Sequence, residues 1–109
     1  MSLFSVVATS YEITKEFDKN DSTFTIVERV KATKIALKHF ELSQAATNRE
    51  LSRNLALLDI LAERKHKFEL KAARLKRKYR AATTLERRID LVNKINKNID
   101  NLNLIAEVI

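Results

Sequence analysis

The chain has 109 residues, contains no Gly, Pro, Cys or Trp, and carries a formal net charge of +7. Without Cys it has neither a disulfide framework nor a thiolate metal site, and without Gly it has no Gly-rich phosphate-binding loop. Its charged fraction of 32% and apolar fraction of 45% are typical of one folded domain.

Residues 1–22 form an N-terminal segment with two structured interpretations, and disorder is the third alternative. Apolar and polar residues alternate over 11–17, and the polar run 18–22 resembles a turn that leads to Phe24 and Ile26. This pattern predicts a β-hairpin. The alternative is a short helix, because one helical face would carry Leu3, Val6, Ser10, Ile13 and Phe17.

From Thr25 onward the sequence is typical of helices. Thr or Ser followed three residues later by Glu is the capping-box signature of a helix start. It occurs at Thr25 with Glu28, Thr47 with Glu50, and Thr83 with Glu86. These boxes predict helices at about 26–46, 48–81 and 84–108.

A heptad pattern complicates the boundary near residue 47. Steps of four and three residues connect one seam from Ile26 to Ala82 without interruption, which favours a continuous or slightly bent helix over 26–81. The capping box at Thr47 favours a break instead. The seam runs through Ile26, Val30, Thr33, Leu37, Phe40, Gln44, Thr47, Leu51, Asn54, Leu58, Leu61, Lys65, Phe68, Ala72, Leu75, Tyr79 and Ala82.

The last helix has a seam of its own, which begins after a short connector at 82–84. Two seams joined in this way predict an antiparallel helical hairpin. We therefore expect an all-α fold, either a long hairpin or a coiled-coil-like bundle. The predicted second seam consists of Leu85, Arg88, Val92, Ile95, Ile99, Leu102, Ala106 and Ile109.

Five Asn residues lie in this last helix, and none falls on the predicted seam. We expect them at the surface, since Asn is a poor helix former with a polar side chain. Asn96 and Asn103 flank the seam, where they would set the register across an interface. A coding bias toward Asn and Lys codons, as in AT-rich genomes, is the simpler explanation.

The last helix is long enough to cover only the second half of a continuous helix. Residues 26–58 would then need the N-terminal segment or another subunit as a partner, and we expect a homo-oligomer. The expected oligomer seam is Val30, Leu37, Phe40, Leu51 and Leu58.

The net charge is concentrated in residues 63–80, which hold nine basic and two acidic side chains. At helical spacing a basic stripe forms from Arg64, Lys67, Lys71, Arg74 and Lys78. A basic hairpin tip forms from Arg77, Arg80, Arg87 and Arg88. The stripe has four interpretations: a solvated or intersubunit helix face, a contact for an acidic protein surface, a contact for nucleic-acid phosphates, or a contact for an anionic membrane surface.

No catalytic, cofactor or metal site is expected. The two histidines, His39 and His66, lie far apart, and the Glu63 to His66 spacing occurs once, whereas di-iron bundles repeat it. We expect no small-molecule substrate. No apolar run approaches the length of a membrane span and the first residues lack a basic signal region, so a cytoplasmic location is expected.

The sequence therefore favours a non-enzymatic assembly, adaptor or chaperone-like protein that acts through protein–protein contacts. The alternative is a nucleic-acid-binding protein that uses the basic stripe on phosphates. Small helical hairpins occur among secretion chaperones, phage assembly proteins and nucleoid- or ribosome-associated factors, which is a likeness of shape and does not decide function.

Overall fold

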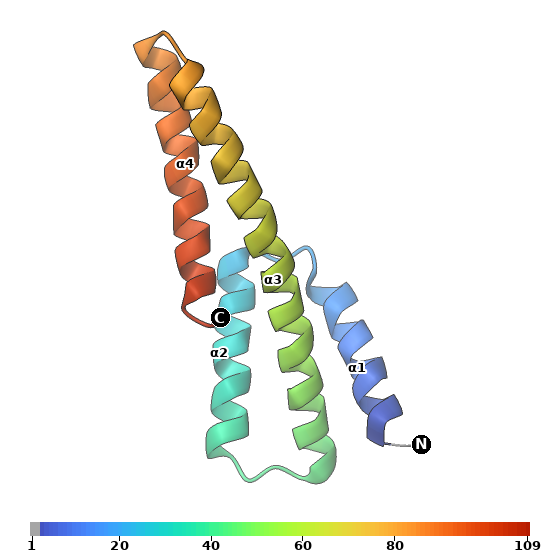
Figure 1. Ribbon diagram of the computed structural model, residues 1–109. Coiled ribbons are helices and arrows are strands. Elements are labelled where there is room, and N and C mark those ends of the chain that lie inside the picture. The colour runs from blue at the N-terminus through green and yellow to red at the C-terminus, as the bar shows by residue number, and fades with distance from the viewer. Residues whose placement is uncertain (1–2) are drawn as a thin grey trace.

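The computed structural model describes the backbone of residues 3–109 and the side chains of residues 9–109. It contains the helices α1 (Leu3–Asp18), α2 (Thr23–His39), α3 (Gln44–Ala81) and α4 (Leu85–Ala106), shown in Figure 1. The all-α fold expected from the sequence is thus confirmed. Helix α3, about 57 Å long, is the spine: α1 and α2 flank its first half and α4 its second half.

The molecule is elongated, with principal extents of 61 × 26 × 17 Å. Its radius of gyration is 18.2 Å, whereas a compact domain of this length has about 13 Å. The elongation arises because α4 and the second half of α3 project beyond the other helices (Figure 1). This projection leaves much of the α3–α4 pair in contact with solvent.

The β-hairpin interpretation of the N-terminal segment is wrong, because α1 is helical from Leu3 to Asp18 and α2 begins at Thr23. The helix alternative is correct, but the expected apolar face does not all turn inward. Ile13 is 64% exposed and Phe17 is 79% exposed. Among the described side chains of α1, only Asp18 is buried.

The continuous helix over 26–81 is also wrong, since α2 ends at His39 and the chain reverses before α3 begins at Gln44. The extended Phe40 caps the end of α2, and Ser43 caps the start of α3, where its side chain accepts a hydrogen bond from the Ala46 amide at 3.2 Å. The reversal lays α2 alongside the first half of α3 (Figure 1). An unbroken heptad pattern therefore does not distinguish one long helix from two that fold back on each other.

The turns need no glycine, because no described residue has a positive φ angle. Each helix from α2 onward starts at an extended Ser or Thr whose hydroxyl accepts an amide hydrogen bond two or three residues into the helix. These caps are Ser22, Ser43 and Thr84. The predicted starts at Thr25, Thr47 and Thr83 lie within a few residues of the caps but are not the caps themselves.

The hydrophobic core lies where α2, the middle of α3 and the end of α4 meet. Its members are Ile26, Val27, Val30, Leu57, Ile60, Leu61 and Ile105. The expected oligomer seam therefore does not exist as one surface. Val30 is completely buried and Leu37 and Leu58 are half-buried within the chain, whereas Phe40 and Leu51 remain exposed.

The predicted α3–α4 hairpin is confirmed, and α3 contributes the expected seam residues Phe68, Ala72, Leu75 and Tyr79. On α4 the predicted seam is right at Ile95 and Leu102 and wrong at Leu85, Val92 and Ile99, which are exposed. The inward face consists of the buried Leu91, Asn98 and Ile105 with the half-buried Ile95 and Leu102. Helix α4 is apolar on two faces, and the position of Ile105 in the core decides which of them faces α3. Asn98 was expected at the surface and is 3% exposed.

Candidate interaction surfaces of the helical arm

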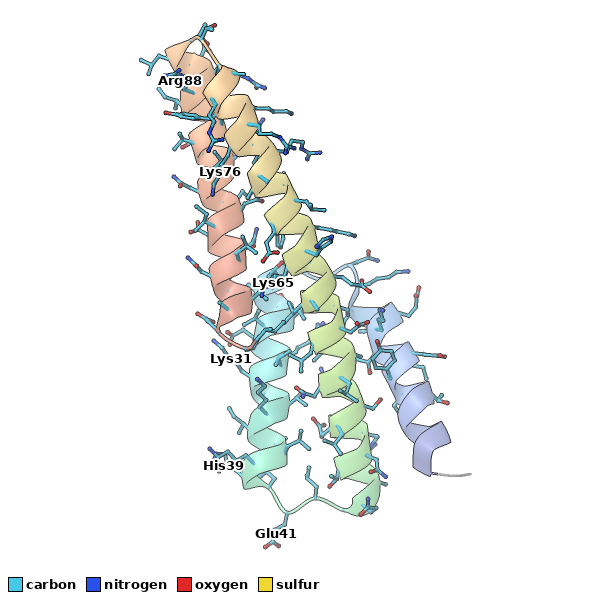
Figure 2. All side chains as sticks on the ribbon, in the orientation of Figure 1. Lys31, His39, Glu41, Lys65, Lys76 and Arg88 are labelled. Carbon is cyan, nitrogen blue, oxygen red and sulfur yellow. The ribbon has the colours of Figure 1, made fainter. Side chains whose placement is uncertain are left out.

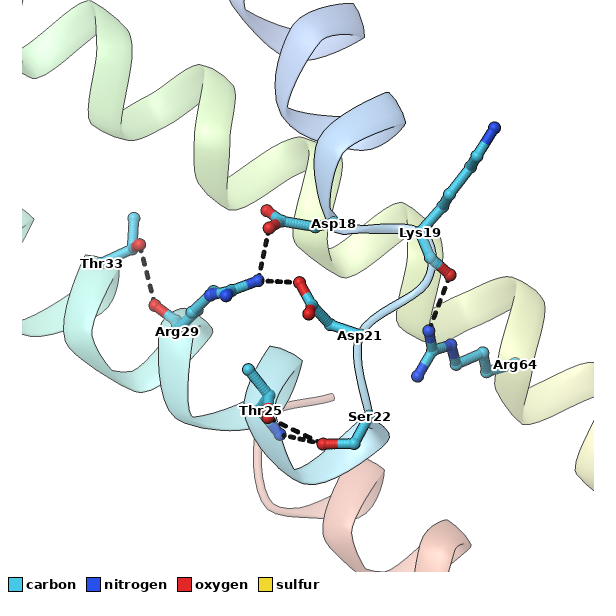
Figure 3. A network of polar contacts seen from close by, with 8 residues as sticks. All are labelled: Asp18, Lys19, Asp21, Ser22, Thr25, Arg29, Thr33 and Arg64. Atoms are coloured by element: carbon cyan, nitrogen blue, oxygen red, sulfur yellow. Dashed lines mark hydrogen bonds and ion pairs between the residues drawn. The ribbon is translucent and has the colours of Figure 1, made fainter.

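The turn between α1 and α2 contains a network of charged side chains (Figure 3). The guanidinium of Arg29 donates to Asp18, whose side chain is buried, and to Asp21. The hydrogen bond to Asp21 and the charges of both carboxylates raise the pKa of Arg29. The network fixes the angle at which α1 leaves α2.

Arg64 belongs to this turn, and this corrects its assignment to the basic stripe. Its guanidinium donates to the Lys19 carbonyl at 3.0 Å and to the Thr23 hydroxyl at 3.2 Å. Burial of the half-exposed side chain lowers the pKa of Arg64. Arg64 therefore holds the α1–α2 turn against α3.

Helix α1 is attached to α3 through a second polar cluster. Asp59 accepts hydrogen bonds from the Tyr11 hydroxyl at 2.6 Å and from the Lys15 ammonium at 2.5 Å. Lys15 also lies 3.1 Å from a carboxylate oxygen of Glu63. The hydrogen bonds from Lys15 and Tyr11 lower the pKa of Asp59, and the hydrogen bond to Asp59 raises the pKa of Lys15.

Next to this cluster, the end of α1 and the middle of α3 border an open cleft of about 530 Å³. Its lining mixes carboxylates, amines and one apolar side chain, which include Glu16, Lys19, Ile60 and Lys67. Lys15 pairs with Glu63 and Lys19 with Glu16, whereas Lys67 lies at the edge of the cleft without an ion pair in the described chain. The two ion pairs make the cleft part of the α1 attachment.

We define the arm as residues 65–106, which comprise the second half of α3 and all of α4. The arm holds twelve Lys and Arg side chains and four carboxylates, whereas the rest of the chain holds nine and ten. Seven ion pairs of the described residues lie outside the arm or at its end, and only Asp90, paired with Arg87 and Lys94, provides ion pairs within it. The net charge of the protein therefore resides in the arm, largely unneutralised.

The remainder of the predicted stripe, which we call the basic row, consists of Lys67, Lys71, Arg74 and Lys78. All four are exposed. None forms an ion pair or hydrogen bond with the described part of the chain. The row follows one face of α3 over about 17 Å, and its amines and guanidinium are available to an external anion.

The hairpin tip is basic, as the sequence predicts, but one of its arginines makes contacts within the chain. Arg88 lies over the Tyr79 ring, 5.4 Å from the centroid, and its Nε donates to the Ala82 carbonyl at 3.0 Å. Arg77, Arg80 and Arg87 are exposed. Figure 2 shows Arg88 at the free end of the arm.

The arm also carries an apolar surface that the sequence analysis missed. Leu85 is 75% exposed and Ile89 is 54% exposed, and Val92 and Ile99 continue the same face of α4 at heptad spacing. The same spacing also passes through positions 96 and 103, which are the exposed residues Asn96 and Asn103. We call these six residues the α4 row. The heptad spacing of this row is present in the sequence, but the sequence analysis assigns Leu85, Val92 and Ile99 to the contact with α3.

The described residues include no group of three or more His, Cys, Asp or Glu side chains placed to hold a metal ion. None of their helices is long and apolar enough to cross a membrane. No protein-family model matches the chain, and no match was found among curated proteins or solved structures. The candidate sites of this protein are therefore the basic row and the α4 row.

Proposed function

We propose that the protein is a non-enzymatic helical assembly or adaptor protein that acts through protein–protein contacts made by its arm. The observation that supports this proposal is the coexistence on one projecting arm of unpaired cations and an unpartnered apolar row. The cations on one face of the arm fit an acidic protein surface, and the apolar row on another face fits a separate protein contact. The basic row would meet the acidic residues of the first surface.

Binding to nucleic acid is the second candidate. It is supported by the spacing of Lys67, Lys71, Arg74 and Lys78, four unpaired cations along one helix face. The exposed apolar residues of the α4 row have no role in a phosphate contact. For this reason we rank the protein partner first.

Two labelled probes distinguish the candidates: a 20-residue peptide rich in Glu and Leu, and a 20-base-pair duplex of DNA or RNA. We expect saturable binding of the peptide, measured by fluorescence anisotropy, and weaker binding of the duplexes at moderate salt. Duplex affinity that exceeds peptide affinity and falls steeply with salt would favour the second candidate. Failure of both probes to bind at low salt would contradict both.

The variant Lys71→Glu with Arg74→Glu tests whether the basic row makes the contact. It should reduce peptide affinity by at least ~10-fold, because it replaces attraction by repulsion at two positions. Arg49→Glu with Arg53→Glu is the matched control. It changes the charge equally on exposed positions of α3 outside the arm, and should leave the affinity unchanged. Equal losses in both variants would indicate a response to net charge and not to the row.

A further inference from the structure

We propose that the α4 row binds a second copy of this chain, with the two α4 helices parallel and in register. The proposal rests on the proposed assembly function and names one of its partners. It concerns a different face of the arm from the basic row, so the two can fail separately.

The spacing of the α4 row is that of a coiled-coil seam. Its members follow one another at steps of four, three, four, three and four residues from Leu85 to Asn103. In heptad terms Ile89, Asn96 and Asn103 occupy a positions, and Leu85, Val92 and Ile99 occupy d positions. The chain itself places nothing on this face, since all six side chains are exposed.

Two asparagines at a positions favour a parallel pair. In a parallel coiled coil each a residue faces the same residue of the partner, so Asn96 and Asn103 would each meet their own amide and form hydrogen bonds across the interface. An antiparallel pair centred on the row would instead place Leu85 beside Asn103 and Val92 beside Asn96. The amides would then face aliphatic side chains.

The charges that flank the row are complementary in the parallel arrangement. On the side of α4 away from α3 lie Glu86 and Asp100, both exposed and without an ion pair in the described chain. On the other side, helix geometry places one row of α3 next to the α4 row. That row consists of three cations, Lys65, Lys76 and Arg80, and one carboxylate, Glu69, and is therefore net positive. Figure 2 shows Lys65 and Lys76 on the side of α3 next to α4.

The acidic residues of α4 and the cations of α3 also lie at matching positions along the helix axes. The hydrogen bond from Asn98 to the Phe68 carbonyl and that from Arg88 to the Ala82 carbonyl set the antiparallel register of α3 and α4. In this register Glu86 lies level with Arg80, and Asp100 lies level with Lys65. A parallel partner would therefore bring its Glu86 to Arg80 and its Asp100 to Lys65.

An antiparallel partner would have the opposite effect. The two acidic flanks would meet each other, and the two α3 helices, with their unpaired cations, would lie on the same side of the pair. Like charges that face each other across an interface are unfavourable. Charge and asparagine placement thus favour the same arrangement.

Sedimentation equilibrium of the full chain tests the interface. We expect a monomer–dimer equilibrium in the micromolar range. Ile89→Lys with Ile99→Lys should raise the dissociation constant at least ~100-fold, because it buries unpaired charges in the seam. Leu70→Lys is the matched control, an exposed leucine on α3 outside the row, and should keep the dimer. A wild-type chain that stays monomeric at 200 µM, or a dimer that the double variant does not weaken, would overturn the proposal.

Single cysteines test the orientation, because the chain contains no native Cys. Leu85→Cys should form an interchain disulfide rapidly on mild oxidation, since identical residues are adjacent in a parallel pair. In the antiparallel pair the two residues would lie about 27 Å apart along the axis. Leu70→Cys, at an exposed position outside the row, is the reference for disulfides formed by random collision. A Leu85→Cys chain that crosslinks no faster than Leu70→Cys would contradict the parallel pair.

Charge exchange tests the flanks. Glu86→Lys should weaken the dimer by about 3–5-fold, the effect of an exposed ion pair, and adding Arg80→Glu should restore most of the loss. A combined variant that dimerises no better than Glu86→Lys alone would show that Glu86 and Arg80 do not meet. Binding of the acidic peptide to the basic row is measured in the same samples, so loss of the dimer is distinguishable from loss of the proposed function.

Discussion

Asn98 of α4 donates a hydrogen bond from Nδ2 to the Phe68 carbonyl of α3 at a distance of 3.4 Å. A polar side chain thereby occupies the middle of the buried contact between the two helices of the arm. Carbonyls inside a helix already accept from the amide four residues later, so this bond is an additional one at the Phe68 oxygen. The bond ties position 98 of α4 to position 68 of α3 and so contributes to the register of the arm.

Asn98→Leu should therefore stabilise the arm while weakening its register. We expect the free energy of unfolding to rise by about 1 kcal/mol, since a desolvated amide is replaced by an apolar group of similar size. Chemical denaturation measures this change. A loss of more than about 1 kcal/mol would show that the hydrogen bond outweighs the cost of burying the amide.

Arg64 and Lys71 should respond differently to truncation, although both belong to the predicted stripe. Arg64→Ala removes two hydrogen bonds that join the α1–α2 turn to α3, and should cost roughly 1–2 kcal/mol of stability. Lys71→Ala alters an exposed, unpaired side chain and should change stability by less than about 0.5 kcal/mol. Thermal unfolding of both variants checks the contrast, and equal effects would contradict the assignment of Arg64 to the turn.

The attachment of α1 should weaken in acid. The pKa of Asp59 is lowered in the folded chain by Lys15 and Tyr11, so its contribution to stability is complete above the unfolded pKa. It is lost as the pH falls through the folded value, which lies below about 4. Because Asp59 is partly exposed, we expect a loss of only about 0.5 kcal/mol.

Hydrogen exchange of the α1 amides at pH 6 and at pH 3 measures this effect. The loss of protection between pH 6 and pH 3 should be larger for the α1 amides than for those near Asp90 of α4, because Asp90 pairs only within its own helix. Asp59→Asn should reduce protection of α1 at pH 6 and remove most of the difference between the two pH values. A pH response that survives in Asp59→Asn would assign it to another carboxylate, with Glu63 the first to examine.

Asn54 should be the site of a stabilising substitution. Its Oδ1 is buried and has no hydrogen-bond partner, which costs free energy in the folded state. Asn54→Leu should raise the free energy of unfolding by about 1 kcal/mol and the midpoint of thermal unfolding by several degrees. An unchanged or lower midpoint would indicate that the Asn54 amide is satisfied by water in solution.

Much of the architecture could be predicted from the sequence by local physics. Helix formers without Gly or Pro make helices, and Ser or Thr hydroxyls cap them, so the all-α class and the connector after residue 81 follow from the chain itself. The concentration of charge in residues 63–80 is likewise a property of the sequence, and the structure leaves Lys67, Lys71, Arg74 and Lys78 exposed.

Tertiary packing decided which apolar face of α2 and of α4 contacts α3. The seam of α2 serves equally for a continuous helix and for a reversal at Ser43, and only burial of Val30 against α3 selects the reversal. Helix α4 has two apolar faces, and the place of Ile105 in the shared core turns Leu91 inward and Leu85 outward. Heptad spacing identifies an apolar helix face that can pack against another helix. Which of two such faces packs inside the chain is decided by the arrangement that buries the most apolar area.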